Sequence, residues 1–264
     1  MTAVSRFLEA RGTVLHVRED RNGSGPVWAW VNSLGSDLRI WDSVIQRLPG
    51  RHLRHDLRGH GLSSAPPGPY SIAGLAADLE AVLEHAAAEE VILAGISIGG
   101  LISLRAALDA PQRLRALAVL DSGARIGSHE FWNDRIGKIR AGGLSSVAGG
   151  VSRRWFSPAY PEREPAAFEG YTNMLRRTPL EGYLGACAAL RDEDLTPRLP
   201  EVQLPTLVLC GTEDGATPPE LSRALADGLP RAEYREIPAA GHLPPLEQPE
   251  ETSRLLKEFS NDIG

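Results

Sequence analysis

The stretch VILAGISIGG, residues 91–100, joins a run of apolar residues to the pattern Gly-x-Ser-x-Gly, formed by Gly95, Ser97 and Gly99. The apolar run has the length and composition of a buried strand, and a helical pattern begins directly after it. A serine at such a strand-to-helix turn exposes its hydroxyl, and the flanking glycines leave room for the crowded backbone. The stretch therefore predicts a nucleophilic serine at position 97; the alternative is an ordinary tight turn.

The acid and the base that such a serine requires follow it along the chain, in the order serine, acid, histidine. His242, in the loop AAGHLPP, lies well downstream of Ser97 and past a predicted last strand, whereas His129 falls in the middle of the chain. Asp214 comes just after the apolar run TLVLCG, at a strand end where open α/β sheets build their sites. Asp121, which ends another apolar run, is the rival acid. We predict a triad of Ser97, Asp214 and His242.

A serine nucleophile also needs donors for the oxyanion that forms when it attacks a carbonyl. One donor is predicted to be the backbone amide of Ile98, the residue after the nucleophile. The other is predicted to come from the loop NSLGSDLRIWD, which follows the apolar run VWAWVN, and we assign it to the Leu34 amide. Gly35 in this loop would let the backbone approach the substrate closely.

The pattern of apolar residues predicts alternating strands and helices. Buried strands are predicted at 27–32, 91–96, 114–121, 206–211 and 232–238, and helices at 71–87, 101–111 and 249–259. Nearly continuous apolar strands are typical of a parallel sheet that is covered on both faces. The segment TVLHVRED alternates and is followed by RNGSG, which predicts a hairpin at the sheet edge.

The alternation is interrupted between residues 125 and 200 by sequence rich in glycine, proline, arginine and aromatic residues, with helical stretches. We predict an α/β core domain formed by residues 1–124 and 201–264. Residues 125–200 are predicted to form a helical cap, or lid, inserted after the end of a strand. The core domain is predicted to have a mostly parallel central sheet flanked by helices.

Composition limits the partners. The chain of 264 residues has a net charge of −6, which argues against a nucleic-acid partner. Two cysteines, Cys187 and Cys210, are too few for a disulfide framework or a metal knuckle. The N-terminus has no secretory pattern, and no apolar run approaches the roughly 18 residues that a membrane span needs. We therefore expect a cytoplasmic protein without a membrane partner.

Taken together, the serine turn, acid, histidine and oxyanion loop resemble the α/β-hydrolase fold. Over nearly its whole length the chain looks more specifically like the 3-oxoadipate enol-lactonases of aromatic catabolism, in the β-ketoadipate pathway. The motifs that carry this resemblance are NSLGSDLRIWD, GHGLSSAPPGPYSI, GISIGG, FWNDRI, RRWFSP, EGYLGACAALRDEDL, LVLCGTEDGATPP and EQPE. The resemblance implies a serine hydrolase that needs no metal or organic cofactor and opens the enol-lactone through an acyl-enzyme.

The implied substrate is a small anionic lactone, so a guanidinium is its natural partner. FWNDRI offers Arg135 beside Trp132, and RRWFSP offers Arg153 and Arg154 beside Trp155. We select Arg135, with Trp132 and Trp155 as walls of the substrate site. For any single one of these residues, the alternative is a solvated arginine or a tryptophan that packs the cap on the core.

Other functions share these motifs. They are a different cap-bearing esterase or carbon–carbon-bond hydrolase, a cofactor-free perhydrolase or haloperoxidase, and, in another class, a non-enzymatic receptor for a small molecule. The sequence leaves the oligomeric state open.

Overall fold

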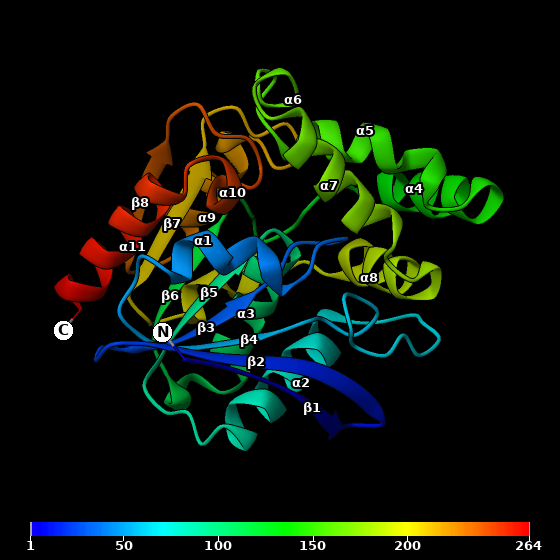
Figure 1. Cartoon of the computed structure of the whole chain (residues 1–264). Coiled ribbons are helices and arrows are strands. Elements are labelled where there is room, and N and C mark those ends of the chain that lie inside the picture. Colours follow the sequence, from blue (N-terminus) through cyan, green and yellow to red (C-terminus); the bar gives the residue numbers. More distant parts are fainter. Residues whose placement is uncertain (1, 264) are drawn as a thin grey trace.

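An eight-stranded sheet forms the centre of the molecule, with the strand order β1-β2-β4-β3-β5-β6-β7-β8 (Figure 1). The computed structural model describes residues 2–263. The strands span Thr2–Ala10 (β1), Thr13–Asn22 (β2), Val27–Val31 (β3), Gly50–His55 (β4), Val91–Ile96 (β5), Leu114–Leu120 (β6), Thr206–Gly211 (β7) and Ala232–Ile237 (β8). Neighbours from β4 to β8 are parallel, and β2 is antiparallel to both β1 and β4. The predicted α/β class with a mostly parallel sheet is confirmed.

Helices cover both faces of this sheet (Figure 1). The helices of the core span Asp42–Ile45 (α1), Ile72–His85 (α2), Ile98–Asp109 (α3), Pro219–Gly228 (α9), Pro244–Glu247 (α10) and Pro249–Asp262 (α11). Short 3₁₀ helices lie at Leu38–Trp41, Pro111–Arg113 and Thr196–Glu201. α3 packs on β5, β6 and α2, whereas α11 packs on α1 and α10. The covered strands β5, β6 and β7 are buried along their whole length except Arg115, which explains their almost unbroken apolar sequence.

A hairpin lies at the sheet edge, as predicted, but its turn is not at RNGSG. β1 and β2 pair from Ala10 opposite Thr13 outward, around a turn at Arg11 and Gly12. Both turn residues have positive φ, 53° and 71°, the conformation that a tight two-residue hairpin requires. RNGSG instead leads from β2 to β3, which is not a neighbour of β2 in the sheet.

Five helices lie between β6 and β7 in the sequence and gather on one side of the core (Figure 1). They are α4 (His129–Gly142), α5 (Ser145–Trp155), α6 (Tyr160–Arg163), α7 (Pro165–Arg176) and α8 (Leu180–Asp192), and we call them the cap helices. α4 packs on α5 and α8, and α5 packs on α7. No helix within residues 2–263 has the length and apolar character needed to cross a membrane. The cytoplasmic location stays a prediction.

Candidate active site

Ser97 occupies the turn between β5 and α3. Its backbone has φ 60° and ψ −122°, a conformation that side-chain-bearing residues rarely adopt. Two hydrogen bonds hold this turn: the Ser97 amide donates to Leu120 O at 3.0 Å, and Ser122 Oγ donates to Ser97 O at 2.7 Å. A Cβ on Gly95 would collide with the backbone of Gly99, which explains why the turn needs glycine there.

His242 and Asp214 meet at the carboxyl end of the sheet. Asp214 follows β7, His242 follows β8, and His242 Nδ1 lies 2.9 Å from Asp214 Oδ2. Thr217 Oγ1 donates to the same Asp214 oxygen at 2.6 Å and lies 3.0 Å from His242 Nδ1. The other oxygen, Oδ1, accepts the backbone amides of Ala216 and Thr217 at 2.7 and 3.0 Å. These contacts hold Asp214 where an orienting acid belongs.

The electrostatic surroundings favour an ionised Asp214. Burial opposes ionisation, but the charge and hydrogen bond of His242 and the hydrogen bonds of Thr217 outweigh it. The pKa of Asp214 therefore lies below its usual value. An ionised acid can stabilise the imidazolium that forms when His242 takes a proton.

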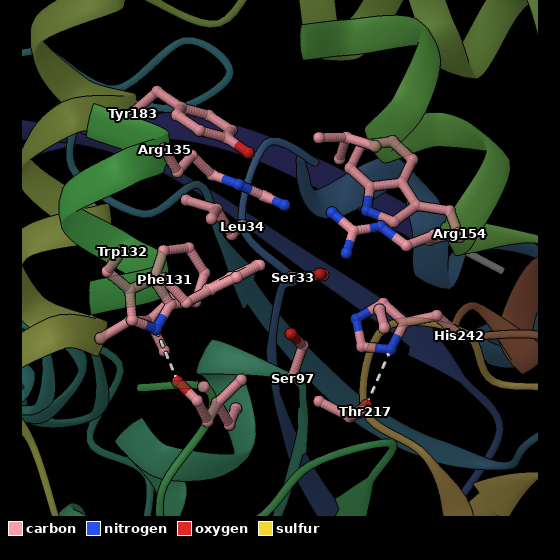
Figure 2. A pocket seen from close by; sticks show the side chains of 16 residues that line it. Ser33, Leu34, Ser97, Phe131, Trp132, Arg135, Arg154, Tyr183, Thr217 and His242 are labelled. Atoms are coloured by element: carbon pink, nitrogen blue, oxygen red, sulfur yellow. Dashed lines mark hydrogen bonds between the residues drawn. The ribbon is translucent and has the colours of Figure 1, made fainter. Parts of the chain in front are cut away.

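Ser97 and His242 line one cavity of about 190 Å³. Figure 2 shows the Ser97 hydroxyl and the His242 ring side by side on the floor of this cavity. Within residues 2–263 no hydrogen bond joins them, which is usual before a substrate tightens the site. The structure thus brings together all three residues of the predicted triad, although their catalytic role stays a prediction.

Other carboxyl groups and histidines that could compete with the triad make different contacts. Asp121 is fully buried after β6 and contacts the Gly211 amide rather than His242. Glu213 and His129 are exposed. His60 is fully buried and bonds to Arg58 O, away from the cavity.

The structure places the residues of the predicted oxyanion hole in the serine turn and in a loop that lines the cavity. Ile98 is the first residue of α3, where an amide has no partner within its own helix. Leu34 lies in the loop after β3 and lines the cavity. In the described part of the chain neither amide donates to a protein acceptor. Gly35 has φ +79°, and a Cβ there would collide with Leu175, so the loop depends on this glycine.

The cap helices supply the other side of the cavity, with three residues predicted from the sequence. Trp132 and Arg135 come from α4 and Trp155 from α5, and all three line the cavity. Trp132 and Trp155 are buried, and the indole N–H of Trp132 donates to Ile126 O at 2.6 Å. The indole N–H is therefore occupied, so Trp132 offers the substrate only its apolar surface.

Comparison with known proteins agrees with this geometry. The model of the family described as "Alpha/beta hydrolase family" matches residues 22–255. The chain is 32% identical to 3-oxoadipate enol-lactonase 2 of Acinetobacter baylyi, over 92% of this chain and 91% of that protein. It superposes on the enol-lactonase from Burkholderia xenovorans LB400 with a TM-score of 0.93 and 35% identity, covering 97% and 100% of the two chains. A thermophilic esterase from Thermogutta terrifontis gives a TM-score of 0.88 and 28% identity, covering 100% and 99%.

The chain belongs to the alpha/beta hydrolase family. It is an enzyme, a hydrolase that acts on ester bonds, and the resemblance to 3-oxoadipate enol-lactonases is confirmed.

In this hydrolase, three residues that line the cavity were not assigned to it from the sequence. Arg154, on α5, faces the cavity, whereas its neighbour Arg153 is exposed. Phe131 lies under both cap arginines, with its ring centre 4.9 Å from the Arg135 guanidinium carbon and 5.9 Å from that of Arg154. Tyr183, in the EGY motif, is buried and points its hydroxyl toward Arg135 (Figure 2). Helix phase decides which of these side chains reach the cavity.

One group of three potential metal ligands exists within residues 2–263 of the hydrolase: Asp121, Cys210 and Asp214. Asp214 already accepts hydrogen bonds on both oxygens from Thr217, Ala216 and His242. This arrangement suits a triad acid better than a metal ligand.

Proposed function

We propose that this hydrolase opens the ring of 3-oxoadipate enol-lactone to give 3-oxoadipate, and so acts in the β-ketoadipate pathway. The proposal is supported by two similar proteins that are named enol-lactonases and by the charge of the cavity. A six-carbon lactone also suits a cavity of about 190 Å³, which is small beside the roughly 300–1,000 Å³ of pockets for drug-sized ligands.

The observation that carries the proposal is a pair of cap guanidiniums above the serine. Arg135 and Arg154 point toward each other across the cavity that contains Ser97 and His242 (Figure 2). Ion pairs in the cap join Arg125 to Asp194, Lys138 to Asp134 and Arg191 to Asp192, and neither Arg135 nor Arg154 pairs with an acid in residues 2–263.

The two positive charges act on each other. Burial, and then the charge of Arg135, lower the pKa of Arg154. A carboxylate placed between the guanidiniums would relieve this repulsion and accept charge-assisted hydrogen bonds from both. The lactone substrate carries such a carboxylate at the end opposite to the ester bond that is cleaved.

The reaction follows from the floor of the cavity. Ser97 Oγ attacks the lactone carbonyl while its proton passes to His242, and the oxyanion accepts hydrogen bonds from the Leu34 and Ile98 amides. When the ring opens, the enol oxygen leaves with the proton from His242, and the enol then tautomerises to the ketone. A water molecule then attacks the acyl carbon while its proton passes to His242; the bond to Ser97 Oγ breaks, His242 returns the proton to Ser97, and the second carboxylate is released.

The test is a spectrophotometric assay on the enol-lactone, with Arg135→Ala compared with Arg140→Ala. Arg140 is an exposed arginine on the same helix and serves as the matched control. Arg135→Ala should raise KM for the anionic lactone and leave the hydrolysis of neutral p-nitrophenyl acetate unchanged, and Arg140→Ala should change neither. No turnover of the lactone by the wild type, or an equal loss on both substrates, would contradict the proposal.

A further inference from the structure

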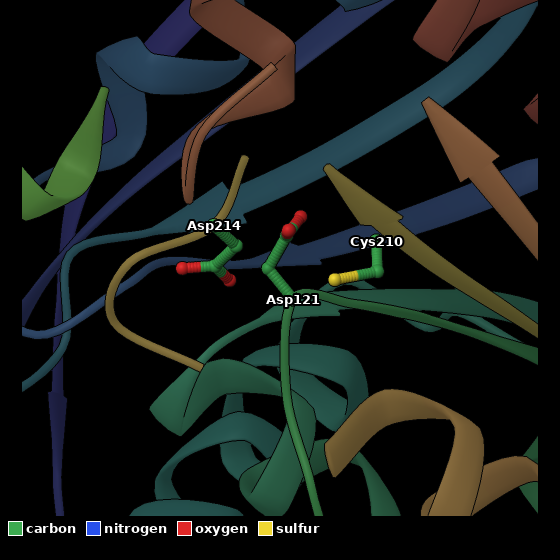
Figure 3. Close-up of side chains that lie close together, drawn as sticks. All are labelled: Asp121, Cys210 and Asp214. Carbon is green, nitrogen blue, oxygen red and sulfur yellow. The ribbon is translucent and has the colours of Figure 1, made fainter. Parts of the chain in front are cut away.

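Asp121 is a buried carboxyl group next to Asp214, and the mechanism above leaves it unused. Its side chain lies between Asp214 and Cys210 (Figure 3). A carboxylate oxygen of Asp121, one of Asp214 and the Cys210 sulfur all lie within 4.8 Å of one another. Oδ1 accepts the Gly211 amide at 2.8 Å, and Oδ2 is buried without a hydrogen-bond donor in the described residues.

The backbone fixes this carboxyl group in place. Asp121 has φ 45°, a conformation that aspartate, asparagine and glycine tolerate better than other residues. Its amide donates to Leu209 O at 2.8 Å, and its carbonyl oxygen lies 2.8 Å from Thr217 Oγ1. The side chain therefore faces Asp214 in a fixed position.

The charges around Asp121 disfavour a second carboxylate. Its titratable neighbours are Asp214 and Cys210; beyond them, His242 acts on Asp214, and Cys210 in turn acts on Tyr234. No arginine or lysine within residues 2–263 donates a hydrogen bond to Asp121. Burial, and then the negative charge of Asp214, raise the pKa of Asp121 well above its usual value. Two carboxyl groups at this separation resist ionising together, so one keeps its proton.

We propose that Asp121 is a positioning residue of the triad, which stays protonated in the folded hydrolase and donates that proton in a hydrogen bond to the Asp214 carboxylate. The unpaired Oδ2 is the atom that holds this proton. The proposal rests on the catalytic role of Ser97, Asp214 and His242 in the proposed function.

A protonated Asp121 tunes His242 as well as placing Asp214. A second negative charge behind Asp214 would stabilise the imidazolium further, so His242 would lose part of its capacity as a base near neutral pH. A neutral Asp121 instead donates a hydrogen bond that stabilises the single negative charge of Asp214 and fixes the orientation of its carboxylate. His242 then faces one carboxylate rather than two.

The first test measures the proton on the resting protein, without any substrate. Infrared spectra should show the carbonyl stretch of a buried protonated carboxyl in the wild type and lose it in Asp121→Asn. The unfolding free energy gives the same answer. A carboxyl group whose pKa is raised on folding stabilises the protein less as pH rises. The free energy of unfolding of Asp121→Asn should therefore increase relative to that of the wild type above about pH 4. The proposal is overturned if the wild type lacks this band and the difference in unfolding free energy between the two proteins does not change with pH.

The second test measures the triad through the pH dependence of kcat/KM on p-nitrophenyl acetate. Asparagine is neutral, can donate a hydrogen bond and tolerates positive φ. Asp121→Asn should therefore keep kcat/KM within about threefold of the wild type, and the fall of kcat/KM at low pH (the acid limb of the profile) should stay at the same pH. Asp121→Gly keeps the backbone but removes the donor, and should lower kcat roughly tenfold and move the acid limb to higher pH. A shift of the limb to lower pH in Asp121→Asn would mean that Asp121 is ionised in the wild type.

These outcomes are separate from those for the proposed function. The infrared band and the stability difference do not depend on any substrate, and the ester assay does not depend on the lactone. Failure of the enol-lactone assay would leave the proton on Asp121 untouched. A missing band would leave the lactonase activity untouched.

Discussion

Two parts of the cavity are held in place in different ways: its floor, around Ser97 and His242, and its roof, formed by side chains of the cap helices. On the floor, Asp214, Thr217 and His242 are fixed by direct hydrogen bonds of 2.6–3.0 Å. On the roof, Arg135 and Arg154 rest on aromatic rings at 4.9–5.9 Å. Hydrogen bonds fix a position to a few tenths of an ångström, whereas a cation over a ring keeps freedom to turn. We therefore expect the floor to carry out ester hydrolysis in general and the roof to select which ester is hydrolysed.

The largest effect should come from removing the nucleophile on the floor. Ser97→Ala should lower kcat by about 10⁶-fold on the enol-lactone and on a neutral ester alike, because it removes the predicted nucleophile. Binding of the lactone to Ser97→Ala, measured by calorimetry, should persist, since the roof is intact. Loss of turnover on the lactone alone would break the division between floor and roof.

The next effect should come from the acid. Asp214→Asn should lower kcat by about 10⁴-fold on both substrates, because an amide stabilises the wrong tautomer of His242. Glu213→Gln is the matched control, since Glu213 is the adjacent, exposed acid and should leave kcat unchanged. Equal losses in the two variants would place the acid elsewhere on the floor.

A smaller and more selective effect is expected on the roof. Arg154→Ala should raise KM for the anionic lactone roughly 10- to 100-fold, the value of losing hydrogen bonds to a charged group, and leave a neutral ester unaffected. Arg153→Ala is its control, since Arg153 is exposed on the same helix. If Arg153→Ala raised KM as much as Arg154→Ala, long-range attraction rather than contact would explain the effect.

The contrast between floor and roof also explains how much of the site could be predicted from sequence. Gly95, Ser97 and Gly99 are required by the turn itself, so a short pattern predicts them. Asp214 and His242 follow strands, and parallel strands bring their carboxyl ends to one edge. The fold class could be predicted for the same reason, because apolar runs of this kind have few alternatives.

The roof depends on helix phase, which short patterns define poorly. Arg153 and Arg154 are neighbours in sequence but point about 100° apart on a helix, so only the packing of α5 decides which faces Ser97. The contact between Asp121 and Asp214 was equally hidden, because it requires β6 and β7 to be adjacent in the sheet. The turn at Arg11 and Gly12 could have been predicted, since glycine favours such turns.

The smallest effect on turnover should come from Glu247, which hydrogen-bonds both to the segment after cap helix α5 and to the loop that carries His242. Glu247 is buried and accepts the Ser157 amide and hydroxyl after α5, at 3.0 and 2.6 Å, and the Gly241 amide beside His242 at 2.7 Å. Glu247→Ala leaves these donors unpaired, so the free energy of unfolding should fall by about 3 kcal/mol, measured by urea denaturation. kcat should fall only about threefold, because the triad keeps its own hydrogen bonds.

The loss of stability in Glu247→Ala should also depend on pH. Burial raises the pKa of Glu247 above its usual 4.5, although its hydrogen bonds act in the opposite direction. A carboxyl whose pKa is raised on folding stabilises most at low pH, so the wild-type advantage over Glu247→Ala should shrink as pH rises above about 4.5. Glu169→Gln, at an exposed position on α7, should show no such trend. An advantage that grows with pH would mean that Glu247 acts as a stabilised carboxylate, and that the link between roof and floor is an ionic one.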